Sequence, residues 1–281
     1  MRWQSGRRSE NIEDRRGMRV SRKTVGGGLG TLILVLVALY FGVDPSVVIQ
    51  NTGTSTELSV PNAPVERTPE EDRLAEFVSV VLADTEDTWH ELFRTHGAEY
   101  REPKLVLFSG AVESACGFAQ SAMGPFYCPA DEKVYMDLVF FQDLKDRFGA
   151  PGDFAQAYVI AHEVGHHVQK LIGISDKVQA ARRQLSESEA NELSVRQELQ
   201  ADCYAGLWAH YAHRTRQIIE EGDIEEALGA ASAIGDDRLQ MKTRGYVVPD
   251  SFTHGTSAQR VEWFQRGLST GSIDACNTFA E

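Results

Sequence analysis

The chain has 281 residues, of which 42% are hydrophobic and 25% are charged, a balance typical of one globular domain with appendages. Its formal net charge is −13. Residues 1–24 hold eight basic side chains against three acidic ones, so this stretch carries +5 and the remainder −18. A body that acidic argues against a nucleic-acid partner and is compatible with a peptide or protein substrate.

A charge-free apolar run over residues 25–43 follows the basic stretch. A helix of this length spans about 28 Å, close to the thickness of a bilayer core. Because basic residues precede the run, the positive-inside rule predicts a single-pass anchor with the N-terminus in the cytoplasm and the remaining chain outside. A cleaved signal peptide is the alternative, but no A-x-A-like site follows the run. We predict a basic cytoplasmic tail over residues 1–24, a transmembrane anchor over 25–43 and a polar linker over 44–67.

The remaining residues, 68–281, read as one mainly helical domain. Thr68, Pro69 and Glu71 form a helix start, with a capping box and a proline in the first turn. Apolar and β-branched runs predict two strands, which form a small sheet. We therefore predict an α+β domain with little sheet. The expected elements are helices from 68 to about 97, 140–148, 153–173, from 186 to about 222 with an internal break, 223–234 and 257–266, and strands 104–108 and 133–138.

Four cysteines lie in the segment that is expected to face an oxidising compartment, and four allow three pairings. Cys116 and Cys128 bracket a short loop with Gly and Pro, which favours a local bridge. Cys203 and Cys276 would then pair by elimination. Free buried thiols are the alternative.

A helix with a metal-binding pattern follows the predicted sheet. Asp153 and Gln156 form a plausible capping box at its start. His162 and His166 are four residues apart, so they lie on one face of the helix, one turn from each other. Their imidazoles can converge on one metal ion, and Glu163 is placed to act on a water bound to that ion. The alternative is two surface histidines with an unrelated glutamate.

A catalytic zinc site normally takes three protein ligands and leaves one position for water. The pattern H-E-x-x-H-x-x-G-x-x-H would supply a third histidine, but Gln169 and Ile172 stand at its glycine and last histidine positions. Glu198 and Asp202 lie four apart on a downstream helix. Glu198 can bind the metal while Asp202 hydrogen-bonds a ligand histidine and fixes its tautomer. The competing ligands are Glu187, Glu189, Glu192, His210 and His213.

These motifs resemble those of the putative neutral zinc metallopeptidases of bacteria, a membrane-anchored family. The resemblance runs nearly from end to end, and it implies a zinc peptidase site, with one Zn²⁺ per chain, more firmly than it implies a substrate. In layout the site is also similar to the wider zincin class, whose third ligand is a downstream helix glutamate. The matching motifs are MRW at 1–3, EDRR at 13–16, GPFYCP at 124–129, HEVGHHVQ at 162–169, ELQADC at 198–203 and HGTSAQR at 254–260.

The sequence thus predicts a zinc-dependent endopeptidase, anchored in the bacterial cytoplasmic membrane, with its catalytic domain outside the cytoplasm. Zinc would lower the pKa of a bound water to about 7, and Glu163 would take the proton as that water attacks a peptide carbonyl. The developing oxyanion needs a donor. His254, in a turn before a helix, is the candidate, with Tyr246 a second one. A structural role in that turn is the alternative for His254.

The main alternative function is a non-catalytic, zinc-stabilised extracytoplasmic binding or assembly protein. A structural zinc site is closed by four protein ligands and has no use for a base, so Glu163 favours the enzyme. Zinc-dependent hydrolysis of a non-peptide bond is a third option, because ligands alone do not define a substrate. The physiological substrate, the cleavage preference and the oligomeric state do not follow from the sequence.

Overall fold

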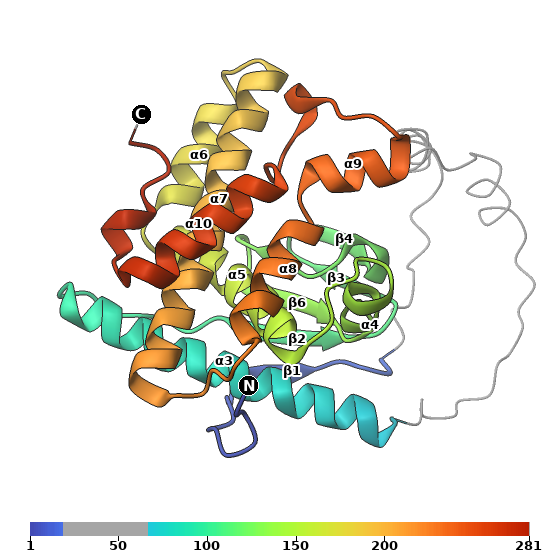
Figure 1. The fold of residues 1–281 in the computed structure, drawn as a ribbon, viewed down its shortest axis with the longest axis vertical. Helices are drawn as coiled ribbons and strands as arrows, with labels where there is room; N and C mark the ends of the chain where they lie inside the picture. Colours follow the sequence, from blue (N-terminus) through green and yellow to red (C-terminus); the bar gives the residue numbers. More distant parts are fainter. Residues whose placement is uncertain (19–66, 281) are drawn as a thin grey trace, which may run out of the picture. The chain divides into compact units, whose positions relative to one another are not determined.

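The computed structural model describes residues 1–18 and 67–280, and two distant stretches of this part build one sheet (Figure 1). Its strands β1, β2 and β6 run parallel, whereas β5 is antiparallel to β6 at the edge. A separate antiparallel hairpin is formed by β3 and β4. The sheet order is β1 (Ile12–Asp14), β2 (Lys104–Phe108), β6 (Lys133–Asp137), β5 (Phe126–Cys128), and the hairpin consists of β3 (Ala111–Ser114) and β4 (Gly117–Gln120).

Both faces of the sheet are covered, which explains why its central strands are apolar without alternation. Leu105 and Leu107 of β2 pack into the main core with the helices, while Val106 and Phe108 pack with the β3–β4 hairpin. Successive side chains of a strand point to opposite faces, so a strand buried on both faces is apolar at nearly every position. The two strands predicted from their composition, β2 and β6, are confirmed.

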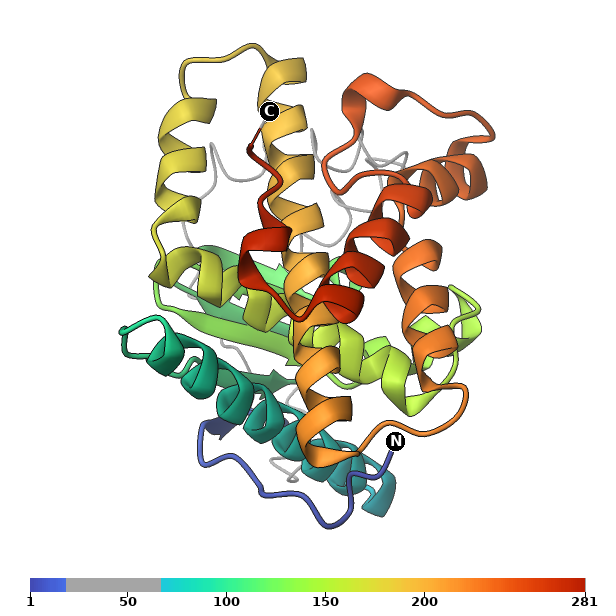
Figure 2. The same ribbon diagram turned by 60° about the vertical axis from the view of Figure 1, so that its left-hand side comes forward.

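Long helices form the rest of the main core (Figures 1 and 2). The first begins with the predicted capping box, in which the Thr68 hydroxyl accepts the Glu71 N–H and the Glu71 carboxylate accepts the Thr68 N–H. The described residues thus form the predicted mainly helical α+β domain. The helices are α3 (Pro69–Thr95), α4 (Val139–Asp146), α5 (Asp153–Leu171), α6 (Ile174–Arg182), α7 (Glu187–Tyr211), α8 (Asp223–Ala233), α9 (Asp236–Arg244) and α10 (Ser257–Thr270).

Helix α7 contacts α3, α5, α6 and α10. Helix α10 packs along it, and two glycines lie in the contact (Figure 2). A Cβ on Gly206 would lie 2.0 Å from the carbonyl oxygen of Phe264, and one on Gly267 would lie 1.9 Å from that of Cys203. No larger residue fits at either position unless the helices move apart. Beyond Tyr211, α7 continues into a π-helical turn, Ala212–Arg216, and the helix ends there. The predicted helix to about residue 222 is therefore too long, because the pattern breaks without resuming before α8.

The domain contains two disulfides, and both predicted pairings are confirmed. Cys116 and Cys128 join the β3–β4 hairpin loop to β5, with Cα atoms 5.8 Å apart. Cys203 and Cys276 join α7 to η4 (Ile273–Cys276), a 3₁₀ turn that follows α10. All four cysteines of the chain are therefore paired.

Residues 1–18 belong to the same compact unit as residues 67–280, whereas the sequence predicts a separate tail over residues 1–24. Strand β1 pairs in parallel with β2, with Ile12 opposite Leu105. The side chains of Met1 and Trp3 are buried in the main core, where the Trp3 ring meets Phe77 edge-on. The N-terminal segment is thus part of the domain.

The basic side chains of this segment neutralise carboxylates of the acidic domain. Arg7 lies 2.8 Å from both Glu86 and Asp87 of α3. Arg16 is buried and pairs with Asp14 and with Asp72 of α3. Arg2, Arg8 and Arg15 also form ion pairs. Opposite charges at this distance attract, so these arginines contribute to holding the segment on the domain.

The β1–β2 pairing also constrains any membrane topology. A single crossing between residues 18 and 67 would put the two strands on opposite sides of the membrane. The predicted arrangement, with the N-terminus inside and the domain outside, is therefore incompatible with this sheet. The predicted anchor over 25–43, and all but the last residue of the linker over 44–67, lie outside the described residues. Within residues 1–18 and 67–280, no helix is long and apolar enough to cross a bilayer.

Replacing Trp3 by alanine tests whether the N-terminal segment is part of the fold. The change removes a buried aromatic ring, so we expect the free energy of unfolding of the full-length chain to fall by about 3 kcal/mol. The control, Arg2→Ala, removes an exposed ion pair to Glu220 and should cost less than about 1 kcal/mol. Denaturant unfolding measures both. Equal, small effects would mean that the segment is a detached tail.

Candidate metal centre

Helices α5 and α7 approach each other where Gly165 faces Ala201. A Cβ at Gly165 would lie 3.1 Å from the Ala201 carbonyl oxygen and 3.2 Å from its Cα, which is tighter than ordinary van der Waals contact. The absence of a side chain at Gly165 therefore allows the two backbones to come close. This contact brings the predicted histidines of α5 next to the predicted carboxylates of α7.

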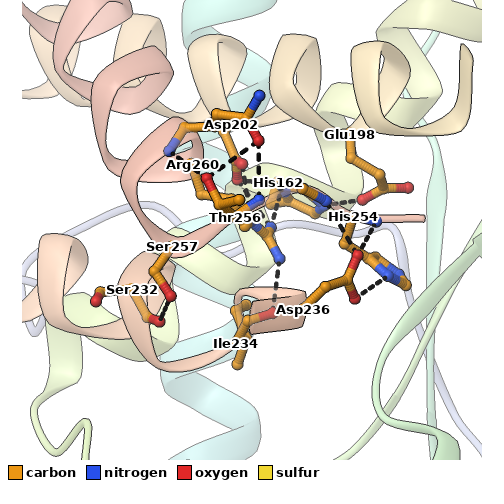
Figure 3. Close-up of polar contacts among 12 residues, drawn as sticks. His162, Glu198, Asp202, Ser232, Ile234, Asp236, His254, Thr256, Ser257 and Arg260 are labelled. Carbon is orange, nitrogen blue, oxygen red and sulfur yellow. Dashed lines mark hydrogen bonds and ion pairs between the residues drawn. The ribbon is translucent and has the colours of Figure 1, made fainter. Parts of the chain in front are cut away.

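Three predicted ligands meet in this contact. The Nε2 atom of His162 lies 3.1 Å from one carboxylate oxygen of Glu198 (Figure 3). The Nε2 atom of His166 lies 3.4 Å from the other. The three ligand atoms all lie within 4.8 Å of one another. The His162 side chain is buried, while those of His166 and Glu198 keep 14% and 19% of their surface exposed, so the group faces solvent on one side.

The other ring nitrogen of each histidine has its own acceptor, which fixes the tautomer. His162 Nδ1 lies 2.9 Å from the Asp202 carboxylate, which can only accept a proton when ionised. His166 Nδ1 lies 2.9 Å from the Gln169 amide oxygen. Both histidines therefore carry a proton on Nδ1 and turn Nε2 towards Glu198, where Nε2 is the atom left to bind a metal when the ring is neutral. Metal-binding histidines are oriented in this way.

The electrostatics of the group favour positive charge between its members. Burial alone would lower the pKa of His162, but the charge of Asp202 and its hydrogen bond, with a further bond to Glu198, raise it to about 10. Burial would likewise lower the pKa of His166, and Glu198 raises it. Burial would raise the pKa of Glu198, yet His166 and His162 hold it well below its usual value. A divalent cation would satisfy the same preference without protons on the imidazoles.

The donor set suits zinc. Two imidazole nitrogens and one carboxylate oxygen are borderline ligands of the kind that Zn²⁺ takes in catalytic sites, where three protein groups leave a position open. Their ligand atoms are already gathered, and both histidines present the required nitrogen. His162, His166 and Glu198 are therefore the residues that could hold the metal.

Arg260 was not assigned a role by the sequence, although it stands in one of the matching motifs. The residue is 2% exposed, and its guanidinium bonds both oxygens of Asp202 at 2.9 Å, reaching from α10 to α7 (Figure 3). The Tyr158 hydroxyl of α5 donates to the same carboxylate and lies 3.2 Å from Arg260. Because Asp202 is fully buried, this arginine compensates its charge and keeps it ionised beneath His162.

Glu163 lies beside this group and is not engaged elsewhere. Its side chain is 8% exposed, and its charge contributes to raising the pKa of His166. Within residues 1–18 and 67–280, no hydrogen bond or ion pair reaches its carboxylate. A buried carboxylate without a fixed partner can accept a proton from a nearby water.

His254 lies in a turn that is built around a buried carboxylate. One oxygen of Asp236 accepts the N–H groups of Thr253, His254 and Gly255, at 2.8, 2.6 and 3.1 Å. The other lies 3.4 Å from His254 Nδ1 (Figure 3). Burial would lower the pKa of His254, but the hydrogen bond to Asp236 and the charge of Glu198 raise it. The turn therefore holds a half-exposed imidazole whose positive charge acts on Glu198. Asp236 was missed because its partners follow it by 17 to 19 residues.

The remaining histidines of these helices lie away from the group. His167, which follows the second ligand, is buried and bonds the Tyr127 hydroxyl and the Arg101 carbonyl. His210 bonds the Leu268 carbonyl, and with His213 it lines a separate cavity of about 570 Å³. Neither competes with Glu198 for the same ion.

Tyr246, the second candidate donor to the oxyanion, is exposed.

The predicted capping box at Asp153 and Gln156 is wrong. Helix α5 starts after Gly152, and its first turn is capped from a distance, since the Glu226 carboxylate accepts the Phe154 N–H at 3.0 Å. A Cβ at Gly152 would lie 2.0 Å from the Glu226 carboxyl carbon, so the glycine makes room for this cap. A carboxylate supplied by another helix has no signature in the local sequence.

Comparisons with known proteins found one matching family and several relatives. The family described as "Putative neutral zinc metallopeptidase" matches residues 1–279. The uncharacterised protein YpfJ of Escherichia coli strain K12 is 52% identical over 290 aligned positions, which cover 100% of this chain and 99% of that protein. The uncharacterised protein Rv2575 of Mycobacterium tuberculosis strain H37Rv is 40% identical over 254 positions, covering 86% and 85%. No solved structure matches the chain.

Asp202→Asn tests the buried network independently of any metal. The change leaves the Arg260 charge buried without its partner, so we expect the free energy of unfolding, measured with a chelator present, to fall by about 3 kcal/mol or more. Asp250→Asn, an exposed change after α9, is the control and should have little effect. An Asp202→Asn protein as stable as the wild type would show that the pair does not compensate a buried charge.

Proposed function

Because the chain belongs to the putative neutral zinc metallopeptidase family, we propose that it is a zinc-dependent endopeptidase whose metal is held by His162, His166 and Glu198. The observation that carries the proposal is the arrangement of these three ligand atoms beside an unengaged carboxylate, Glu163. In the described part of the chain this group offers three ligands and not four. A closed structural zinc site would need a fourth, whereas a catalytic site leaves that position to water.

Glu163 is the proposed general base. Zinc, when bound, supplies Lewis acidity towards a carbonyl and lowers the pKa of a coordinated water. Glu163 takes a proton from the attacking water and passes it to the leaving amine of the cleaved peptide bond. Its burial and its freedom from hydrogen bonds suit this task, because a carboxylate held by a strong donor would be a weaker base.

His254 is the proposed donor to the oxyanion that develops on the substrate carbonyl. Its Nδ1 faces Asp236, and the raised pKa favours the charged imidazolium, in which Nε2 also carries a proton and can donate a hydrogen bond. Asp236 itself is fixed by three backbone N–H groups, which pre-orients the imidazole. A donor that is already oriented stabilises developing charge without reorganisation during the reaction.

The proposed substrate is a peptide or protein in an oxidising compartment. Both disulfides support this placement, because structural disulfides persist outside the reducing cytosol. The sheet requires residues 1–18 to lie in the same compartment as the metal centre. Attachment to a membrane through residues 25–43 remains a prediction from composition.

Glu163→Gln tests the proposed base. The amide keeps the size of the side chain but cannot take a proton, so we expect the rate of peptide hydrolysis to fall about a thousandfold while zinc stays bound. A diverse peptide library, incubated with the full-length protein with and without a chelator, measures the activity. A variant that remains active would reject this role. Zinc binding without chelator-sensitive cleavage by the wild type would favour a zinc-stabilised binding protein.

Glu198→Ala tests the third ligand. Removing one of three ligands should reduce the zinc content per chain to a small fraction of the wild-type value after dialysis against a weak chelator. Glu192→Ala, an exposed change on the same helix, is the matched control and should retain zinc. Elemental analysis of both variants gives the ratio. Equal zinc contents would mean that Glu198 is not a ligand.

A further inference from the structure

The two candidate histidine ligands are oriented through Nδ1 by different partners, and the partner of the second is uncharged. His166 Nδ1 donates to the amide oxygen of Gln169, one turn further along α5. Gln169 is fully buried, and its amide nitrogen donates to the Gln197 carbonyl at 2.7 Å and to the Gln200 side-chain oxygen at 3.0 Å. The Gln169 side chain therefore uses its oxygen as the acceptor for His166 and its nitrogen as the donor to α7.

Gln200 continues the chain to the C-terminal part of the molecule. It is 2% exposed, and its amide nitrogen donates to the Cys276 carbonyl at 3.0 Å. Cys276 is fully buried and forms the disulfide with Cys203, three residues beyond Gln200 on α7. The bridge therefore holds the accepting carbonyl beside the amide that uses it.

The direction of this hydrogen-bond chain matters for the metal centre. The Cys276 carbonyl can only accept, so Gln200 must turn its nitrogen towards it and its oxygen towards Gln169. Gln169 must then present its own oxygen to His166. With that oxygen as its partner, the His166 ring keeps its proton on Nδ1 and its lone pair on Nε2.

We propose that Gln169 and Gln200 are positioning residues that couple the metal ligand His166 to the disulfide between Cys203 and Cys276. The inference rests on the proposed metal centre and assigns a role in it to the C-terminal bridge. When the bridge is reduced, the Cys276 carbonyl loses its covalent tie to α7, and the acceptor of Gln200 is held less firmly. The Thr278 hydroxyl still donates to the Arg196 carbonyl of α7. The Gln197 carbonyl still holds Gln169, so the coupling weakens metal binding without abolishing it.

Reduction and metal binding are then linked equilibria. Two electrons and two protons convert the bridge into two thiols, while two molecules of a thiol reductant such as glutathione are oxidised to one disulfide. If the bridge raises the affinity for zinc by some factor, bound zinc must favour the bridge over the dithiol by the same factor.

Zinc affinity, measured by competition with a chromophoric chelator on the full-length chain, tests the coupling directly. We expect Cys203→Ser/Cys276→Ser and Gln200→Ala each to weaken binding about tenfold, and their combination to add little, because both interrupt one chain. Cys116→Ser/Cys128→Ser removes the other bridge and should leave the affinity unchanged. Gln197→Ala keeps the backbone carbonyl that Gln169 uses and should also leave it unchanged.

A second readout separates the coupling from a general loss of stability. In the Cys116→Ser/Cys128→Ser background, the ratio of disulfide to dithiol at Cys203 and Cys276 is measured by alkylation in a glutathione buffer. We expect zinc to raise this ratio about tenfold, and Gln200→Ala to remove the increase. An unchanged ratio would overturn the proposal. A shift towards the dithiol form would do the same, since it would mean that the freed cysteines bind zinc.

The proposal and the proposed function fail in different ways. If the zinc affinity is the same with and without the Cys203–Cys276 bridge and in Gln200→Ala, the coupling is wrong, and the proposed peptidase function is unaffected. If both changes weaken zinc binding but the wild-type protein hydrolyses no peptide, the coupling is supported and the proposed peptidase function is wrong.

Discussion

One buried carboxylate, that of Asp202, joins three helices to a candidate metal ligand. It lies on α7 and accepts hydrogen bonds from Tyr158 and His162 of α5 and from Arg260 of α10. A fully buried charge without such partners would cost several kcal/mol. Helix α7 can therefore occupy its place only when both neighbours bring donors to it. The packing of the core and the orientation of His162 depend on the same group.

This arrangement makes the two candidate histidine ligands unequal. His162 donates to a carboxylate that an arginine keeps ionised, whereas His166 donates to the neutral amide of Gln169. Hydrogen bonds to charged groups are about twice as strong as neutral ones. The first ligand is thus held by the helical core itself. The second is held by an amide that the Gln197 carbonyl and the Gln200 side chain orient together.

The sequence predicted those parts of the site whose geometry is local. Two residues four apart on a helix share a face, which was enough to select His162 with His166, and Glu198 with Asp202. Contacts between distant segments left no such pattern. Arg260 lies 58 residues from Asp202, and Glu226 lies 72 residues from the N–H group that it caps. Strand β1 has only three residues and gains its stability from pairing with β2, so its composition did not reveal it.

The N-terminal arginines show how the same residues can support two different interpretations. Counted along the sequence beside an apolar run, they are the signal that the positive-inside rule uses. In the fold, Arg7 and Arg16 neutralise carboxylates of α3, and Arg16 is buried. Because these arginines form ion pairs inside the folded domain, they are not evidence for a separate cytoplasmic tail. The parallel strands β1 and β2 hold residues 12–14 and 105–107 in one sheet, so the arginines that precede the apolar run belong to the folded domain.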